Sequence, residues 1–301
     1  MHAVPLSKAL GAELVDVDIT APFSADEQAE LRRLFCLHHL LLVRGQELTA
    51  EDQDRFVGSF GPLQKNRAGD SAGYVTNQDH PRSLFGKEMY RLLWHGDGAY
   101  TSRPGIATSL WAEDVSPTAT PTEFANAVEI VDRLPADLRA KVERYRIMNV
   151  RDTAFNRTTE RVTRDEIVNT DDTERYVTYV HPILFDPPHL DKKAVIASEF
   201  MTSYVVDVSL EESDAFLEEL YGHLYADDNV YSHQWRSDDL IIWDNIALHH
   251  GRPRGVDLDS PRHMRRQCID GWYADDGDVI DWALAAIKPR AHQQMERPIR
   301  H

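Results

Sequence analysis

The sequence is poor in cysteine and has no long apolar run, and each shortage excludes a class of protein. Only two cysteines, Cys36 and Cys268, occur in 301 residues, which excludes a disulfide framework and favours a reducing, cytoplasmic setting. No apolar stretch approaches the roughly 18–20 residues that span a bilayer. The N-terminal segment has no apolar region behind a basic start, so no secretory signal is predicted.

Basic residues are also scarce. Lysine and arginine total 33 against 50 acidic residues, which gives a formal net charge of −17. A chain of this sign repels phosphate backbones and anionic lipid headgroups. We therefore expect neither nucleic acid nor a membrane as the main partner, and a small-molecule partner remains. A homo-oligomer is left open.

Nothing in the sequence divides the chain. It lacks a repeat of 20–50 residues, a low-complexity tract and a Gly/Ser-rich linker, so solenoids and propellers are not expected. Its length and its 42% hydrophobic content are sufficient for a sizeable core. We predict one domain over residues 1–301.

The pattern along the chain indicates many short strands with helices gathered near the N-terminus and later in the chain. Alternating or short apolar runs predict strands at 12–18, 40–43, 90–95, 106–112, 147–150, 194–197, 204–207, 230–235, 240–243 and 263–269. Capping boxes and apolar spacing predict helices after Ser24, over 49–60, 124–134 and 137–145, and from Ser209 to Leu224. The polar segment 151–180 is predicted to be a long loop or lid. These elements favour an α+β fold, mainly β with helical cover, as a sandwich or barrel.

One short motif could bind a metal ion. In His95-Gly96-Asp97 the first and third residues point to the same face of a strand, so an imidazole and a carboxylate can converge on one ion. A distant third ligand would complete the 2-His-1-carboxylate set that holds non-haem Fe(II) with open positions. A second match, His189-Leu190-Asp191, lies in a Pro- and Lys-rich segment and is interpreted as a solvated loop.

The third ligand is sought in the pair His249-His250, which follows a predicted strand and an Asp-Asn turn. Adjacent residues on a strand face opposite ways, so only one of the two histidines can join the site. A purely structural histidine remains the alternative at this point.

The blocks together resemble a known family. Trp94-His95-Gly96-Asp97, then Thr122, then Trp243-Asp244-Asn245 with His250, then Arg262 and Arg266 are similar in order and spacing to the taurine dioxygenase/2,4-D dioxygenase (TauD/TfdA-like) family of Fe(II)/2-oxoglutarate oxygenases. The likeness extends to residues 41–63, 122–135 and 181–185. It implies a double-stranded β-helix core, the jelly roll of the cupins, and O2-dependent oxidation of a small substrate with release of succinate and CO2.

The resemblance also implies a role for individual residues. His95, Asp97 and His250 would bind iron, with His250 selected because the family's distal histidine lies six residues after the Asp of Trp-Asp-Asn. Thr122 and Arg262 would contact the C5 carboxylate of 2-oxoglutarate, which suits the planar fork of arginine. Arg266 would face the same pocket and grip an anionic substrate, or pair with a nearby Asp. The other predicted residues of the substrate pocket are Asn77, Trp94 and Tyr100.

The sequence departs from the family pattern at several positions. Ile246 stands where the family usually has arginine, and Gly96 replaces a frequent threonine, which is expected to widen the pocket. Gln64-Lys65-Asn66 stands where taurine-type enzymes carry a substrate-binding histidine, so taurine is not expected. Asp97 is present where related halogenases have a small residue, which disfavours halogenation.

Several alternatives remain for the reaction. Hydroxylation is the expected outcome, and desaturation, cyclisation or oxidation to an aldehyde would need the same machinery. A zinc hydrolase with the same three ligands and a non-catalytic metal-binding jelly-roll protein are the competing classes. A nucleic-acid demethylase is disfavoured by the charge.

Overall fold

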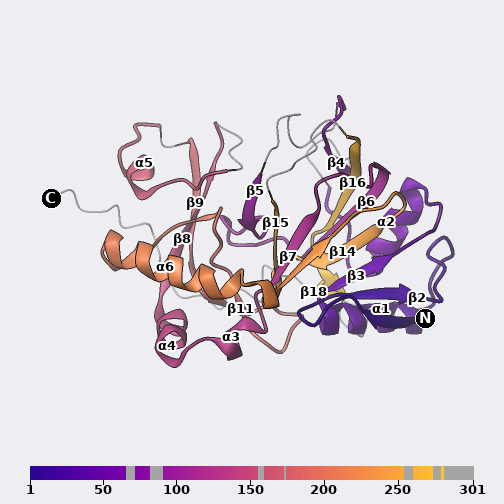
Figure 1. Ribbon diagram of the computed structural model, residues 1–301, viewed down its shortest axis with the longest axis horizontal. Coiled ribbons are helices and arrows are strands. Elements are labelled where there is room, and N and C mark those ends of the chain that lie inside the picture. The colour runs from indigo at the N-terminus through magenta and orange to yellow at the C-terminus, as the bar shows by residue number, and fades with distance from the viewer. Residues whose placement is uncertain are drawn as a thin grey trace.

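The computed structural model describes residues 1–65, 72–81, 91–154, 159–172, 174–253, 260–273 and 279–280. Within these ranges the largest element is a seven-stranded sheet, which crosses the right half of Figure 1. In spatial order its strands are β1 (His2–Pro5), β2 (Ala12–Val15), β3 (Leu40–Val43), β14 (Leu240–Asp244), β6 (Ala107–Val115), β16 (Arg262–Ile269) and β4 (Ala72–Thr76). Its neighbours pair antiparallel except β2 and β3, which are parallel.

A four-stranded antiparallel sheet faces the large one. Its order is β13 (Val230–His233), β7 (Thr122–Asn126), β15 (Leu248–Arg252) and β5 (Leu92–His95). The Phe124 ring of β7 lies 5.4 Å from the Trp243 ring of β14, so the two inner faces interdigitate. The two sheets form the double-stranded β-helix, or jelly roll, that the sequence predicts, and the apolar core lies between them and beneath the helices.

A third sheet extends this core at the left of Figure 1. It consists of β12 (Thr202–Val205), β8 (Arg146–Asp152) and β9 (Tyr176–Pro182). Two short antiparallel pairs complete the strands: β10 (Leu184–Phe185) with β11 (Ala194–Val195), and β17 (Trp272–Tyr273) with β18 (Val279–Ile280).

The helices cover the sheets from outside. They are α1 (Ala25–His38), α2 (Ala50–Gly58), α3 (Ile130–Arg133), α4 (Ala136–Arg144), α5 (Arg164–Val168) and α6 (Leu210–Leu224), with a 3₁₀ turn η1 (Asp227–Asn229). In Figure 1, α1 and α2 flank the large sheet, whereas α6 runs below β8 and β9. The predicted capping box at Ser24 is complete, but at Ser209 only the hydroxyl accepts its bond, from the Glu212 amide. No described helix is long and apolar enough to cross a bilayer.

Two predicted elements differ from the structure. The helix expected over 124–134 is strand β7 followed by the single turn α3. Hydrogen bonding of β7 to both β13 and β15 outweighs the helical spacing of its apolar residues. The segment 151–180, expected to be a loop, contains the end of β8, helix α5 and most of β9. Its closure as a lid stays a prediction, and residues 155–158 and 173 lie outside the described ranges.

Candidate active site

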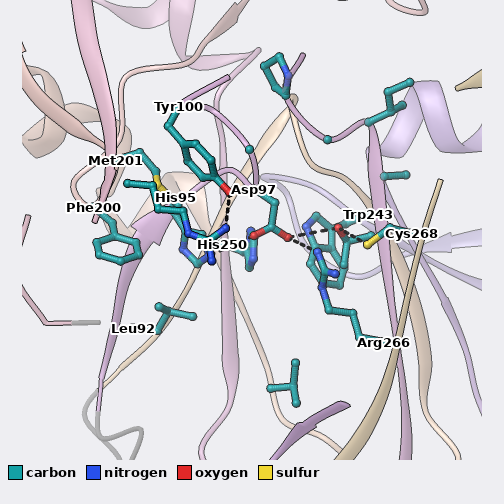
Figure 2. A pocket seen from close by; sticks show the side chains of 18 of the residues that line it. Leu92, His95, Asp97, Tyr100, Phe200, Met201, Trp243, His250, Arg266 and Cys268 are labelled. Atoms are coloured by element: carbon teal, nitrogen blue, oxygen red, sulfur yellow. Dashed lines mark hydrogen bonds and ion pairs between the residues drawn. The ribbon is translucent and has the colours of Figure 1, made fainter. Parts of the chain in front are cut away.

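Three candidate metal ligands converge between the two main sheets. His95 ends β5, Asp97 lies in the turn that follows, and His250 sits on β15 directly opposite His95 in the strand pairing. One ligand atom from each of the three lies within 4.8 Å of the others. The two imidazole rings are 4.1 Å apart, and His95 Nε2 is 3.7 Å from Asp97 Oδ1. Figure 2 shows the Asp97 carboxylate between the two histidines and Arg266.

The side-chain amide of Asn245 helps to hold the turn that carries Asp97. Asn245 donates through Nδ2 to the carbonyl oxygens of Asp97 and Gly105, both at 2.9 Å, and accepts the Asp97 amide at 2.8 Å. A Cβ on Gly96 would lie 2.9 Å from the Asn245 carbonyl oxygen. Gly96 therefore permits close approach of two backbone segments and does not widen the pocket as expected.

The protonation states of the candidate ligands suit a metal ion. His95 Nδ1 lies 2.9 Å from the Leu93 carbonyl oxygen, which can only accept, so Nδ1 carries the proton and Nε2 keeps its lone pair. His250 Nδ1 is buried without a hydrogen-bond partner among the described residues. Burial lowers the pKa of His95, and burial together with His95 lowers that of His250 well below its ordinary value. Both imidazoles are therefore neutral and able to coordinate.

The carboxylate in the group is ionised. Burial alone would raise the pKa of Asp97, but the Arg266 guanidinium holds it well below its usual range. Arg266 Nη2 donates to Asp97 Oδ2 at 2.7 Å, and the Thr108 hydroxyl lies 3.4 Å from the same oxygen. The other carboxylate oxygen of Asp97, Oδ1, lies on the side of the two histidines. Two neutral nitrogens and one carboxylate oxygen on one face fit Fe(II) with open positions, and they also fit zinc.

A second group, suited to binding an anion, lines the same cavity. Arg262 on β16 donates through Nη2 to the Thr122 hydroxyl at 3.0 Å and through Nε to the Thr120 carbonyl at 3.1 Å. Trp235 Nε1 also donates to the Thr122 hydroxyl, at 2.9 Å. Because that oxygen accepts two bonds, its own proton is available to a further acceptor.

Arg262 carries a buried charge that an anion would stabilise. Its side chain makes no ion pair within the described residues, and burial, with Arg252 nearby, lowers its pKa to about 9. A carboxylate placed between Arg262 and the Thr122 hydroxyl would supply the missing counter-charge.

The cavity that joins these groups has a volume of about 710 Å³. Leu92, Val162, Phe200 and Met201 form an apolar wall, and Phe200 meets the His95 ring edge-on at 5.7 Å. The charged residues of the lining are Arg103, Arg151, Arg252, Arg262, Arg266, Asp97, Asp152 and Asp270. Arginines thus outnumber aspartates here, in a chain whose net charge is strongly negative.

The structure brings most of the predicted site residues to this cavity and places two elsewhere. Tyr100 lines it with the metal-ligand candidates, Thr122, Arg262 and Arg266. Trp94 stacks on Tyr225 at 4.8 Å instead, on the opposite face of β5 from His95. The Asn77 amide accepts from the Arg262 backbone N–H and donates to the Ser260 carbonyl. Asn77 and Trp94 are not among the described residues that line the cavity.

Two further interactions support the strands that carry the histidines. His249 faces away from the cavity: its Nε2 donates to the Val195 carbonyl at 2.9 Å, and its Nδ1 accepts from the Tyr225 hydroxyl at 3.0 Å. Burial lowers the pKa of His249 to about 3. Tyr225 thus connects β15 with Trp94 of β5. The helical spacing of the aromatic residues after Ser209 indicates that Tyr225 packs inward, but it does not reveal that Tyr225 contacts His249.

His189 is where the sequence interpretation was wrong. It is not solvated: its side chain is fully buried, and its Nε2 lies 2.7 Å from Asp244 Oδ2. Asp244 Oδ1 accepts the amides of Ile246 and Ala247, at 3.0 Å each. This pair joins the 186–193 segment to the turn between β14 and β15. The polar residues that flank His189 in the sequence do not indicate that its side chain is buried.

Comparisons with known proteins identify relatives of this chain. A family model described as "Taurine catabolism dioxygenase TauD, TfdA family" matches residues 2–268. The chain is 28% identical over 293 residues to the alpha-ketoglutarate-dependent 2,4-dichlorophenoxyacetate dioxygenase of Cupriavidus pinatubonensis, covering 88% of this chain and 96% of that one.

Solved structures show the same fold. A putative alpha-ketoglutarate-dependent taurine dioxygenase from Burkholderia xenovorans superposes with a TM-score of 0.72 at 24% identity, covering 92% of this chain and 96% of that one. AAD-2, in complex with Mn(II) and N-oxalylglycine, superposes with a TM-score of 0.74 at 23% identity, covering 89% and 97%.

Proposed function

The chain belongs to the taurine catabolism dioxygenase TauD, TfdA family, and we propose that it hydroxylates an unactivated C–H bond of a small, anionic metabolite with release of succinate and CO2. It is a 2-oxoglutarate-dependent dioxygenase, and such enzymes use Fe(II), 2-oxoglutarate and O2.

We assign His95, Asp97 and His250 as the iron ligands. The observation that carries this assignment is the convergence of two neutral imidazoles and an ionised carboxylate within 4.8 Å at the wall of one cavity. When bound there, iron supplies O2 activation coupled to oxidative decarboxylation of the co-substrate. The Arg266 contact fixes the Asp97 carboxylate so that Oδ1 faces the histidines.

Arg262 and Thr122 bind the far carboxylate of 2-oxoglutarate. The guanidinium supplies the counter-charge, and the hydroxyl supplies the proton that its two accepted bonds leave available. This orientation directs the other end of the co-substrate toward the three ligands. Leu92, Phe200 and Met201 exclude water from the space beside the ligands, where the substrate C–H would lie.

The test is a two-stage binding and turnover experiment. Under anaerobic conditions the protein should bind Fe(II) and then 2-oxoglutarate, each with one site per chain. Admission of O2 in the presence of candidate small metabolites should then produce succinate only with a true substrate. Hydrolysis of an ester or amide without O2, dependent on zinc, would overturn the proposal and favour the hydrolase alternative.

A further inference from the structure

The candidate ligand Asp97 lies between two glycines. Gly96 precedes it, and Gly98, which follows it, has a φ of 76°, in the left-handed region. Because glycine has no Cβ, a segment of this kind has much backbone freedom unless other residues hold it. The orientation of the Asp97 carboxylate therefore depends on contacts that fix the chain on both sides of it.

One set of contacts holds the ends of the loop that Asp97 begins. Asn245 binds the Asp97 amide and carbonyl and the Gly105 carbonyl. The Gly105 amide also donates to the Asp97 carbonyl, at 2.9 Å. These bonds close residues 97–105 into a loop, but they do not reach residues 98–101, which directly follow Asp97.

A second set of contacts holds residues 98–101 from the three-stranded sheet. Asn149 on β8 donates through Nδ2 to the Ala99 carbonyl at 3.1 Å, and His181 Nε2 on β9 lies 2.8 Å from the Thr101 carbonyl oxygen. A carbonyl oxygen only accepts, so His181 Nε2 carries the proton. Burial lowers the pKa of His181, so its ring is neutral and donates without carrying a charge.

The pairing of β8 with β9 brings these two donors to one face. Ile147 is directly opposite His181, and Asn149 lies two residues further along β8, so Asn149 and His181 share a face. Asn149 Oδ1 accepts the Thr202 hydroxyl of β12 at 2.7 Å, which fixes the amide with Nδ2 toward Ala99. All three strands of this sheet thus support the two donors.

These contacts are compatible with a bound metal ion. The acceptors are the backbone carbonyls of Ala99 and Thr101, not the Asp97 carboxylate, so an ion on that carboxylate does not compete for them. Asp97 and Tyr100 both line the cavity (Figure 2), so the position of this segment bears directly on the site. A purely structural contribution of the two donors to the sheet is the alternative, and it predicts no effect on metal binding.

We propose that Asn149 and His181 are positioning residues, which fix residues 98–101 and thereby hold the Asp97 carboxylate in the orientation that binds the metal ion. This inference rests on the proposed function, because it takes Asp97 as a metal ligand. Without the two donors, Asp97 would be followed by an unsupported segment that begins with glycine. Metal binding would then have to order this segment, and that cost would weaken the affinity.

The test measures Mn(II) binding to the metal-free full-length chain by calorimetry. His181→Phe keeps a ring and removes the donor, and Asn149→Leu removes the amide with little change in volume. Residues that support metal ligands are typically worth about 10–100-fold in metal affinity, so each variant should raise the dissociation constant for Mn(II) at least about tenfold. His181→Gln, which can present an N–H group at a similar reach, should restore most of the affinity.

Asn229→Leu is the matched control. Asn229 is also fully buried, and it donates to the carbonyls of Asn126 and Leu224 at 3.0 and 2.7 Å. Its printed hydrogen bonds within the described ranges do not involve residues 97–105. Urea unfolding in EDTA gives the folded fraction of each variant, so that affinities refer to folded protein. Asn229→Leu should lower the free energy of unfolding but leave the dissociation constant for Mn(II) unchanged.

Hydrogen exchange of the parent protein tests the same proposal without a substitution. Because the two donors order residues 98–101 before the metal ion binds, the amides of Ala99 and Thr101 should be protected to the same extent with and without Mn(II). Protection that develops only when Mn(II) is added would overturn the proposal.

The binding data have equally definite outcomes. The proposal is wrong if His181→Phe and Asn149→Leu bind Mn(II) as tightly as the parent, if Asn229→Leu weakens binding equally, or if His181→Gln binds no better than His181→Phe. A parent protein that binds no Mn(II), or an Asp97→Ala variant that binds it as tightly as the parent, would instead refute the ligand assignment. The two failures are therefore distinguishable.

Discussion

The buried pair of His189 and Asp244 is expected to contribute strongly to the free energy of unfolding. In His189→Leu the side-chain volume changes little, but Asp244 loses its partner while remaining fully buried. Leaving a buried carboxylate without one of its hydrogen-bond partners costs about 1–3 kcal/mol or more. Asp244 keeps two backbone donors, from Ile246 and Ala247, so the expected loss in the free energy of unfolding is about 3 kcal/mol at pH 7.

The pH dependence of this loss follows from the pKa of Asp244. In the parent protein burial would raise that pKa, but His189 holds it below its ordinary value. The carboxylate therefore stabilises the fold at neutral pH, and the contribution is lost as the pH falls through the folded pKa. In His189→Leu the carboxylate loses the largest influence that lowers its pKa, so burial shifts the pKa of Asp244 upward relative to the parent protein. Lowering the pH then neutralises the unpaired charge, so the deficit should shrink from pH 7 to pH 5.

The assay is urea unfolding of the metal-free protein in EDTA, followed by tryptophan fluorescence at both pH values. His2→Leu is the matched control, because His2 pairs with Asp16 at 3.1 Å with both side chains exposed. That pair should contribute no more than about 1 kcal/mol. The double variant His189→Leu/Asp244→Asn should be more stable than His189→Leu alone. A deficit below about 1 kcal/mol, or one that is the same at both pH values, would refute the reasoning.

Three further predictions concern the site and its support. Asp97→Ala should abolish substrate-dependent succinate formation, measured by chromatography; unchanged turnover would contradict the ligand assignment. Arg262→Gln should raise the dissociation constant for 2-oxoglutarate at least about tenfold, while calorimetry should show that Fe(II) binding is retained. If 2-oxoglutarate binding and Fe(II) binding were weakened equally, Arg262 would have a structural role instead. Tyr225→Phe leaves His249 Nδ1 buried without its hydrogen-bond donor. A urea titration should therefore show a free energy of unfolding that is lower by about 1–3 kcal/mol. A change below about 0.5 kcal/mol would contradict this role of Tyr225.

The sequence predicted the parts of the site that depend on local geometry. His95 and Asp97 were found because a two-residue spacing at the end of a strand brings two side chains to one face. The same rule places Trp94 on the opposite face, where the structure has it against Tyr225. Its assignment to the pocket therefore overlooked a signal that the sequence contained.

Other features depend on contacts that local patterns do not encode. The apolar spacing after Thr122 matched a helix, yet pairing on both sides makes β7 a strand. The buried partner of His189 is Asp244, 55 residues further along the chain. Likewise, the Arg266–Asp97 pair spans 169 residues. In each case a distant partner, not the neighbouring sequence, determines the local environment.

The Asn245 amide has a consequence for how the protein matures. It bonds to the Asp97 turn across 148 residues of chain, and His250 on β15 is similarly distant in sequence from its strand partner His95 on β5. Contacts of such long range form late, because closing a long loop costs entropy before it is compensated. If the proposed ligands are correct, the set is complete only when β5 and β15 have paired, and iron binding would require that assembly. Metal loading would then serve as a measure of completed folding, and variants that slow strand assembly would delay it without altering a single ligand.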